Sequence, residues 1–401
     1  AIKIERPDNS EWIVIDQVGI PNMAHGESFG RFPDGAGTKR FFDKPTPGWS
    51  NAIGSNDIIS LYSVAEGGNL PFVFMKDETS VEWVPAANFE LIVSSDGRME
   101  DNSVRMVNGI ANGMSKINGS EDFIMTFPEF GDSLTVHISK DKHVEEIDRF
   151  ILFDRERTSD HVYHVVSDIE IPVGKTLTIS EGTEIYVAKD KSIKVYGNLI
   201  IMGSHHKPVY FGAMESGESW GQIELMSSAT GDLNYVFFTE GGGLTQFDGR
   251  TDGQAVLALR NSEANLDHVF FIHNEGKAVY ANKSVLHISN SHFSHVMNGV
   301  EVDETDLGVA DSYFMFIPND SPENEIDSFD ALYLYGDPEN KTNAIISNSL
   351  FAYLADDAIE GLNGVMVDVS GNYFRNIYDK AISGSFLDGF IAWNSFVHCD
   401  E

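Results

Sequence analysis

The C-terminal part of the chain repeats a short motif in which a small residue precedes an aliphatic one. The steps between the small residues are 23, 21, 32, 27 and 23 residues, and these residues are Ala255, Ala278, Gly299, Ala331, Ala358 and Ala381. A period of about 20 to 50 residues is typical of supersecondary units that stack on one another. One unit cannot bury its own apolar side, so the repeat predicts a solenoid with a continuous core.

A second repeat places a phenylalanine two or three positions after an Asn or Asp. The intervening segments, such as VEV and LYLY, are rich in β-forming residues, and Asn and Gly interrupt them. The pattern predicts an all-β fold, a right-handed parallel β-helix over residues 161–401, with Asn side chains near the turns bonding the next coil. The phenylalanines expected to stack in its core are Phe237, Phe270, Phe293, Phe314, Phe351, Phe374 and Phe396. A leucine-rich repeat is the alternative solenoid, but its leucine consensus does not occur.

The sequence before the solenoid has a different organisation. Short runs that alternate apolar and polar residues, separated by turn sequences such as SSDG and NGS, predict a smaller β-sandwich-like region. A charged stretch near 154–164 separates this region from the β-helix. We therefore predict three parts, which are a segment over 1–51, the sandwich-like region over 52–160 and the β-helix over 161–401.

The first part carries the sequences SFGRFPDG, from Ser28, and PTPGWSN, from Pro45. Together they resemble the closing strands of a lamin-tail domain, an immunoglobulin-like sandwich common in bacterial surface proteins. The resemblance implies an adhesion or spacer module that has no catalytic residue. The chain begins at Ala1 without a Met, and we expect it to be a fragment of a processed precursor.

The opening coils also carry a resemblance. IPVGKTLTI, EGTEI, VYGNLI and a Trp-Gly-x-Ile sequence follow one another as in bacterial surface β-helix proteins of the pectate-lyase-like superfamily. The match rests on Pro172, Gly174, Gly182, Gly197, Gly203, Pro208, Trp220 and Gly221. That superfamily includes polysaccharide lyases, polygalacturonase-like hydrolases, epimerases and non-catalytic surface proteins. The resemblance therefore implies the architecture and leaves the function open.

The sequence is strongly acidic, with 27 Lys and Arg against 62 Asp and Glu and a formal net charge of −35. Nucleic acids and anionic membranes need a basic footprint, so this charge argues against both as partners. It favours cations, and it suits salty water, where screening reduces self-repulsion. No apolar run of about 18 residues occurs, so no membrane span is predicted. We expect a secreted or cell-surface protein.

The repeat predicts which side chains face outward on one side of the β-helix. Successive residues of a strand alternate between two faces, so the aliphatic residue after each small one faces the core and the next faces out. The core positions are Val256, Val279, Val300, Leu332, Ile359 and Ile382. The outward row is Leu257, Tyr280, Glu301, Tyr333, Glu360 and Ser383.

Two glutamates of this row are candidates for acid–base catalysis. Glu301 and Glu360 lie two coils apart, which at a strand spacing of about 4.8 Å separates their backbones by about 10 Å. Carboxyl groups about 6.5 to 9.5 Å apart suit inverting glycoside hydrolysis. Tyr280 and Tyr333 in the same row are candidates for sugar binding. The alternative interpretation is an ordinary solvated face of an acidic protein.

A second acidic cluster is expected where these strands begin. Stacked carboxylates about 5 Å apart repel one another unless a cation, a Lys or a proton intervenes, and calcium accepts such an all-oxygen environment. The predicted calcium ligands are Asp330, Asp356, Asp357 and Asp379, and no organic cofactor is predicted. Solvated turns without an ion are the alternative.

The DDAIEG segment, from Asp356, resembles the paired aspartates of polygalacturonases. The resemblance implies a catalytic role for Asp357, although the Asn-Thr-Asp, Gly-His-Gly and Arg-Ile-Lys companions of that family do not occur. Lyases of similar fold use a Lys or Arg base beside calcium, and Lys380 and Arg375 are the basic residues nearby. Lys380 is also a candidate for substrate binding. The insertion at 317–330 is expected to wall a groove at Tyr333.

These observations predict two functions of different classes. The first is a non-catalytic extracellular or cell-surface protein that binds a glycan, a matrix or other surface proteins, or acts as a spacer. It follows from the lamin-tail-like start and the missing catalytic motifs. The alternative is a polysaccharide-degrading enzyme, a glycoside hydrolase or a calcium-dependent lyase, that uses Glu301, Glu360 and Asp357 on the outward face.

Overall fold

The computed structural model of the chain describes strands and loops, and none of the described residues lies in a helix. The described residues are 2–8, 11–18, 28–31, 39–42, 56–75, 89–128, 130–139, 143–147, 155–159, 161–215, 217–243, 255–318 and 329–399. Correspondingly, no described helix is long and apolar enough to cross a membrane.

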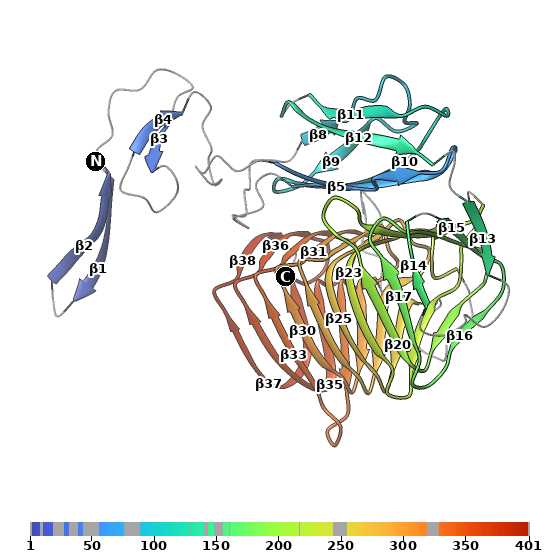
Figure 1. Cartoon of the computed structure of the whole chain (residues 1–401). Coiled ribbons are helices and arrows are strands. Elements are labelled where there is room, and N and C mark those ends of the chain that lie inside the picture. The colour runs from blue at the N-terminus through green and yellow to red at the C-terminus, as the bar shows by residue number, and fades with distance from the viewer. Residues whose placement is uncertain are drawn as a thin grey trace.

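The predicted right-handed parallel β-helix is confirmed. A single 26-stranded sheet runs from β13 to β38, and the strands of successive coils pair in parallel (Figure 1). The structure is all-β, and a smaller, mainly antiparallel β-region precedes the solenoid. The repeat thus identified the architecture, because one short strand recurs at the same place in every coil.

Each coil contributes strands to three faces. The first face contains β16 (Ile169–Ile171), β19 (Ile193–Val195), β22 (Ile223–Met226), β24 (Ala255–Arg260), β26 (Lys277–Asn282), β29 (Val300–Asp303), β32 (Leu332–Gly336) and the beginnings of β35 (Ile359–Ser370) and β37 (Ile382–Ala392). The second contains β14 (Arg155–Arg157), β17 (Thr176–Ser180), β20 (Asn198–Met202), the beginnings of β23 (Thr230–Phe238) and β25 (Glu263–Ile272), β27 (Val285–Ser289), β30 (Asp306–Ala310), β33 (Thr342–Ser347) and the ends of β35 and β37. The third contains β13 (His143–Ile147), β15 (His161–Val165), β18 (Glu184–Val187), β21 (Val209–Ala213), the ends of β23 and β25, β28 (His292–Ser294), β31 (Tyr313–Ile317), β34 (Leu350–Leu354), β36 (Tyr373–Ile377) and β38 (Ser395–Cys399).

The strands before the solenoid form separate small sheets. The two N-terminal hairpins pair β1 (Ile2–Asp8) with β2 (Glu11–Val18) and β3 (Ser28–Arg31) with β4 (Lys39–Phe42). The following region has three sheets, built from β5 (Asp57–Ser60), β7 (Asn69–Met75) and β10 (Ile110–Lys116), from β6 (Ser63–Val64), β11 (Phe123–Phe127) and β12 (Asp132–Ile138), and from β8 (Phe89–Ile92) and β9 (Ser103–Met106).

The predicted limits of the three parts stay a prediction. The parallel sheet begins at β13, before position 161, and position 51 lies outside the described residues. Most of the segment that resembles a lamin-tail domain lies outside the described residues, and β3 is the part of SFGRFPDG that is described. The lamin-tail resemblance therefore stays a prediction.

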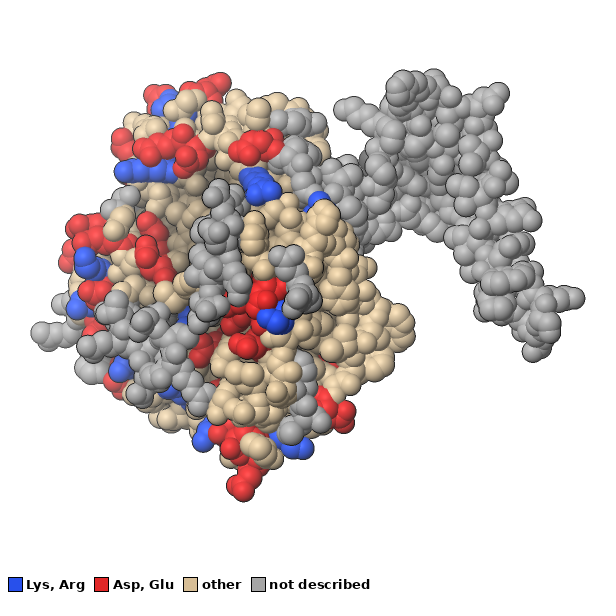
Figure 2. All heavy atoms as spheres, turned by 180° about the vertical axis from the view of Figure 1, so that it is seen from behind, with Lys and Arg blue, Asp and Glu red and all other residues tan. Residues whose placement is uncertain are grey.

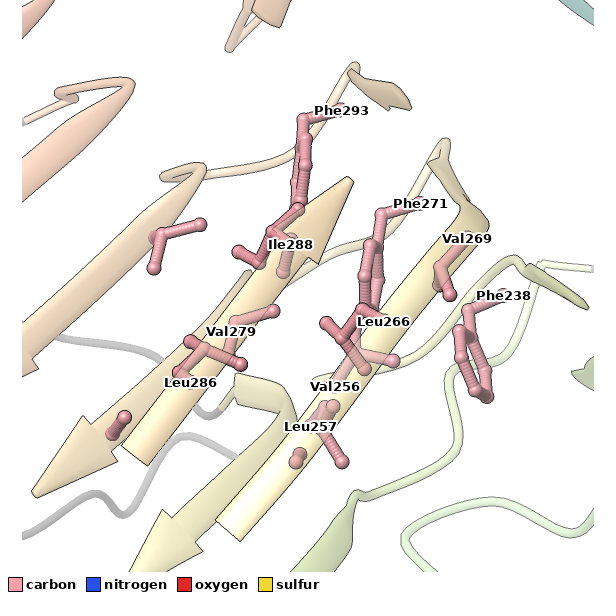
Figure 3. Close-up of a cluster of buried hydrophobic side chains, with 14 of the residues drawn as sticks. Phe238, Val256, Leu257, Leu266, Val269, Phe271, Val279, Leu286, Ile288 and Phe293 are labelled. Atoms are coloured by element: carbon pink, nitrogen blue, oxygen red, sulfur yellow. The ribbon is translucent and has the colours of Figure 1, made fainter. Parts of the chain in front are cut away.

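A column of stacked phenylalanine rings runs through the core. Ring centroids of neighbouring coils are 4.4 to 5.3 Å apart. The column consists of Phe238, Phe271, Phe293, Phe314, Phe351, Phe374 and Phe396, of which the first three appear in Figure 3. Parallel strands repeat at about 4.8 Å, which is a suitable spacing for stacked aromatic rings.

The predicted column was wrong in its first two members. Phe237 and Phe270 are buried, but their rings stack 4.5 Å apart on the outer side of the third face. Their neighbours Phe238 and Phe271 point into the solenoid core instead. The segments carry two adjacent phenylalanines, and period-two alternation sends the two rings to opposite faces. Spacing alone did not identify which ring points inward.

Polar side chains connect the coils at the turn between the second and third faces. The backbone N–H of Ser291 donates to the Ser312 hydroxyl, and that of Ser312 donates to Ser349, both at 3.2 Å. The Asn372 amide continues the ladder by accepting from the Ser349 N–H at 2.9 Å. Asn372 also donates to the Ile346 carbonyl. The predicted bonding of turn Asn side chains to neighbouring coils is thus confirmed here, and serines perform the same role upstream.

The small β-region packs against the third face of the solenoid (Figure 1). Their shared apolar cluster includes Phe72 and Phe74 from the region and Tyr210 and Phe270 from the solenoid. Polar contacts join them as well: the buried Glu184 carboxylate accepts hydrogen bonds from Ser63 at 2.7 Å and from Ser139 at 2.8 Å. The third face is therefore covered over this contact, and the first face, on another side of each coil, carries the outward row predicted from the sequence.

Replacing Phe314 with Ala tests the importance of the ring column. Phe314 is fully buried between the rings of Phe293 and Phe351, so its truncation should lower the free energy of unfolding by about 3 to 5 kcal/mol. Phe396→Ala is the matched control, because this ring is 51% exposed and should cost clearly less. Denaturant titration of both variants measures the difference, and equal losses would contradict the account.

Candidate functional site

The outward row of the first face is arranged almost as predicted. The strand register places Tyr280 beside Glu301, Glu301 beside Tyr333, Tyr333 beside Glu360 and Glu360 beside Ser383. We call Tyr280, Glu301, Tyr333, Glu360 and Ser383 the Tyr/Glu column. The corresponding core positions are buried, with Ile382 partly buried.

Leu257 does not belong to this column, contrary to the prediction. It pairs with Val279, lies fully buried in the core, and leaves Ala258 in the position beside Tyr280. The alignment of the repeat was one residue out at this coil, because Ala255 pairs with Lys277 rather than with Ala278. A shift of one residue exchanges the inward and outward sides of a strand.

A second column lies where the strands of the first face begin. Its members directly precede the small residues of the repeat, and backbone hydrogen bonds link their coils. The N–H groups of Ala278, Gly299, Ala331 and Ala358 donate to the next coil's carbonyl at 2.9 to 3.2 Å. We call this set the Lys/Asp column, and it consists of Lys277, Asn298, Asp330, Asp357 and Lys380.

The two columns meet in a compact group of carboxyl groups. Asp330, Asp357 and Glu360 each place one carboxylate oxygen within 4.8 Å of the others. Asp356, Asp357 and Asp379 form an overlapping group under the same limit. We call these five residues the carboxyl cluster. All four aspartates predicted as calcium ligands belong to it. Figure 2 shows acidic side chains gathered with a few basic ones near the middle of one face of the molecule.

Asp330 is the most enclosed member of the carboxyl cluster. It is 4% exposed, and its Oδ1 atom has no hydrogen-bond partner among the described residues. Burial raises the pKa of the Asp330 carboxyl well above its usual range. Four neighbouring carboxylates raise this pKa further, and they belong to Asp356, Glu360, Asp357 and Glu301. Because both effects disfavour the charged form, Asp330 retains its proton at higher pH than an ordinary aspartate.

The pKa values of Asp357 and Glu360 are also raised, but interactions that favour the charged form oppose the shift. Burial raises the pKa of Asp357, while hydrogen bonds from the Ser383 hydroxyl and the Lys380 N–H lower it. The Lys380 bond measures 2.8 Å. Burial and then the charge of Asp357 raise the pKa of Glu360, and Lys380 lowers it. The pKa values of all three carboxyls are therefore raised, and that of Asp330 is raised well above the usual range.

Glu301 is in a different environment from Glu360. Its Oε2 atom accepts a hydrogen bond from the Lys277 ammonium at 2.5 Å, and the two side chains are 6% and 0% exposed. Lys277 thus neutralises Glu301 within the protein. Glu301 and Glu360 flank Tyr333 as predicted, but only Glu360 is part of the carboxyl cluster.

The sequence did not identify Lys277 as a site residue. The available signal was its position directly before Ala278, which is the position that Asp330, Asp357 and Lys380 occupy in their coils. Arg375, in contrast, lies on β36 of the third face, where its guanidinium donates to Asn108 at 3.2 Å. The predicted loop beside Tyr333 falls largely on residues 319–328, which lie outside the described residues.

The oxygen groups differ in how well they suit a calcium ion. In the group of Asp356, Asp357 and Asp379, the Lys380 ammonium already donates to both Asp379 oxygens, and Asp357 accepts two hydrogen bonds. The group of Asp330, Asp357 and Glu360 contains the unpartnered buried oxygen of Asp330. This second group fits a calcium ion better, because calcium coordinates several carboxylate oxygens and one oxygen here still has no hydrogen-bond partner among the described residues.

Comparison with known proteins adds little to this description. No protein-family model and no curated protein matches the chain. An alginate lyase from Paenibacillus sp. str. FPU-7 is a similar solved structure, with 9% identity, a TM-score of 0.21, and coverage of 55% of this chain and 93% of its own. A family 28 exopolygalacturonase of Yersinia enterocolitica has 11% identity, a TM-score of 0.22 and coverage of 86% of both chains. The chemistry of the site must therefore come from its own side chains.

Lys277→Met tests the buried ion pair. The substitution leaves the Glu301 carboxylate enclosed without its ammonium, and this should lower the free energy of unfolding by about 3 to 5 kcal/mol. The double variant Lys277→Met, Glu301→Gln removes both charges and should recover most of the loss. Denaturant unfolding of the two variants provides the comparison. A double variant as unstable as the single one would contradict the ion-pair account.

The calcium prediction has a separate test. Calcium bound by Asp330, Asp357 and Glu360 in the folded state should raise the melting temperature with increasing calcium, and chelation should lower it. The measurement is a thermal melt at low salt with calcium, with magnesium and with a chelator. Melting temperatures that do not respond to calcium would contradict the calcium prediction. The proton on Asp330 would then be the group that reduces the repulsion between the carboxyls.

Proposed function

We propose that this chain cleaves a glycosidic bond of a polysaccharide at the carboxyl cluster of its first face. The observation that carries the proposal is the enclosed Asp330 carboxyl, whose raised pKa favours the protonated form, within 4.8 Å of carboxylate oxygens of Asp357 and Glu360. Glycoside hydrolysis requires one protonated and one ionised carboxyl, and Asp330 is the member of the cluster that most favours its proton. Perturbed carboxyl groups gathered on an outward face also favour a functional site over a structural one.

Asp330 is the proposed general acid. A general acid must hold its proton near the working pH and release it to the leaving oxygen. Burial and the surrounding carboxylates provide that property to Asp330, because they disfavour its ionised form. The same arrangement distinguishes two carboxyl groups by environment, as acid–base pairs require.

Asp357 is the proposed partner that acts at the anomeric carbon. The Lys380 N–H and the Ser383 hydroxyl each donate to one of its oxygens, and this orients the carboxylate and supports its negative charge. Oxygens within 4.8 Å of one another leave no room for the water of an inverting reaction and are nearer to the retaining separation of about 5 to 5.5 Å, so Asp357 would attack the sugar directly and the released sugar would keep its anomeric configuration. Glu360 belongs to the Tyr/Glu column of the same coil, and one of its carboxylate oxygens lies within 4.8 Å of an Asp357 oxygen.

The tyrosines of the Tyr/Glu column suit the binding of sugar rings. Tyr333 lies between Glu301 and Glu360, and Tyr280 lies on the other side of Glu301, two coils from Tyr333 in the same outward row. Both residues are partly exposed, and the Arg260 guanidinium lies over one face of the Tyr280 ring. A polysaccharide lying along the first face would cross several coils and meet these rings in succession.

Glycan binding without cleavage is the second candidate, and it is the function that the sequence favoured. The Lys277–Glu301 ion pair is an observation in its favour, because it engages one of the two glutamates expected to be catalytic. The absence of the polygalacturonase companion sequences agrees with it. Both candidates place the protein outside the cell or on its surface, which stays a prediction.

Asp330→Asn separates the two candidates. Loss of a general acid typically costs 10²- to 10⁴-fold, so we expect at least about a 100-fold fall in turnover. The assay screens neutral, cationic and anionic polysaccharides, and it follows new reducing ends and the absorbance of unsaturated sugars. Glu304→Gln is the control, because this side chain pairs with Lys283 at 3.4 Å in the turn at the opposite end of β29. Binding to a glycan without cleavage by the wild type would leave the second candidate.

The stability of the same variant distinguishes loss of chemistry from unfolding. The folded state raises the pKa of Asp330, so its contribution to stability is full below the unfolded pKa of about 3.9 and is lost as pH rises through the folded value. Asn carries no such penalty. Asp330→Asn should therefore be at least as stable as the wild type near neutral pH, and a less stable variant would argue against this interpretation.

A further inference from the structure

We propose that the glycan recognised at the carboxyl cluster carries positively charged amino groups rather than carboxylates. This inference rests on the proposed function, because it assigns the substrate class of the same site. It follows from three observations. The two columns carry an excess of acidic groups, their lysines are already bound to carboxylates, and Asp330 has an oxygen without a hydrogen-bond partner among the described residues. Each of these is independent of sequence resemblance.

The site has a large excess of acidic groups. The Lys/Asp column, the Tyr/Glu column and the neighbouring Asp356 and Asp379 together hold six carboxyl groups and two ammonium groups. The acidic members are Glu301, Asp330, Asp356, Asp357, Glu360 and Asp379. With a formal net charge of −35, the rest of the chain does not compensate for this excess. The potential at such a site attracts cations and repels anions.

The two basic residues of the columns are already engaged by carboxylates. Lys277 donates to Glu301, and Lys380 donates to both oxygens of Asp379. Further along the first face, the Arg260 guanidinium donates to Glu224 at 2.8 Å and lies 5.5 Å from the centre of the Tyr280 ring. A uronate carboxylate would have to compete for these cations with the protein's own acids. Recognition of an acidic polysaccharide is therefore disfavoured.

Asp330 provides the place for a donor group of the ligand. Its Oδ1 atom has no partner among the described residues although the residue is 4% exposed. A buried acceptor without a hydrogen bond is costly, and a ligand that donates to it removes this cost. Hydrogen bonds from an ammonium to carboxyl oxygens are among the stronger ones. An amino group of the glycan at this position would also stay near Asp357 and Glu360.

A pair of ligands with the same sugar backbone, one with free amino groups and one with acetylated amino groups, provides the test. The probes are short oligomers of β-1,4-linked glucosamine and the same oligomers with every amino group acetylated, with oligogalacturonate as the anionic probe. Calorimetry on the full chain at low salt should show the amino form binding at least about tenfold more tightly than the acetylated form. Added salt should weaken binding of the amino form, and calcium should compete with it for the cluster oxygens. Equal binding of the two forms, no binding of the amino form, or preferred binding of oligogalacturonate with or without calcium would overturn the inference.

Matched variants exclude a general attraction between a polycation and an acidic protein. Glu360→Gln and Glu304→Gln each remove one negative charge, but only Glu360 belongs to the carboxyl cluster. Glu360→Gln should weaken binding of the amino oligomer at least about tenfold, whereas Glu304→Gln should leave it unchanged. Equal weakening by both variants would contradict a defined site. Selective binding of the amino form without turnover would support this inference and contradict the proposed cleavage. Turnover of an uncharged or anionic glycan would support the proposed cleavage and contradict this inference.

Discussion

Parallel pairing between successive coils is the constraint on which the rest of this structure depends. Strands that pair in parallel repeat at about 4.8 Å, so a residue type that recurs at one place in the coil becomes a continuous column. Inside the solenoid this produces the stack of phenylalanine rings from Phe238 to Phe396. Outside, the same spacing places Asp330 beside Asp357 and Tyr333 beside Glu360. Core and candidate site are therefore two consequences of a single geometry.

The outer columns reduce stability where the inner ones increase it. Stacked apolar groups remove surface from water, but stacked carboxyls bring like charges together in a partly dry environment. Adjacent coils of the first face reduce this charge repulsion in two different ways. Glu301 pairs with the buried ammonium of Lys277, whereas Asp330 has a raised pKa and an oxygen without a partner among the described residues. A group held in an unfavourable state by an otherwise rigid scaffold is a common property of functional sites.

The sequence predicted the architecture and most of the Tyr/Glu column, because these depend only on a recurring small–aliphatic motif. It was wrong at Leu257, Phe237 and Phe270, where the predicted position was one residue away from the true register. Where two apolar residues are adjacent, the spacing does not decide which of them points into the core. Lys277 was missed because the contact with Glu301 joins different positions of neighbouring coils, and no periodic pattern records such a diagonal pair. The protonation of Asp330 depends on burial, which the sequence does not contain.

The protonation state of Asp330 is the quantity that decides whether this account of the site is correct. Infrared difference spectra between the wild type and Asp330→Asn, recorded as a function of pH, isolate the carbonyl stretch of this one carboxyl group. The account predicts a protonated-carboxyl band that persists in the wild type well above the usual aspartate pKa of about 3.9 and is absent from the variant. A band that disappears at the ordinary aspartate pKa would show that Asp330 is a solvated carboxylate and would contradict the account.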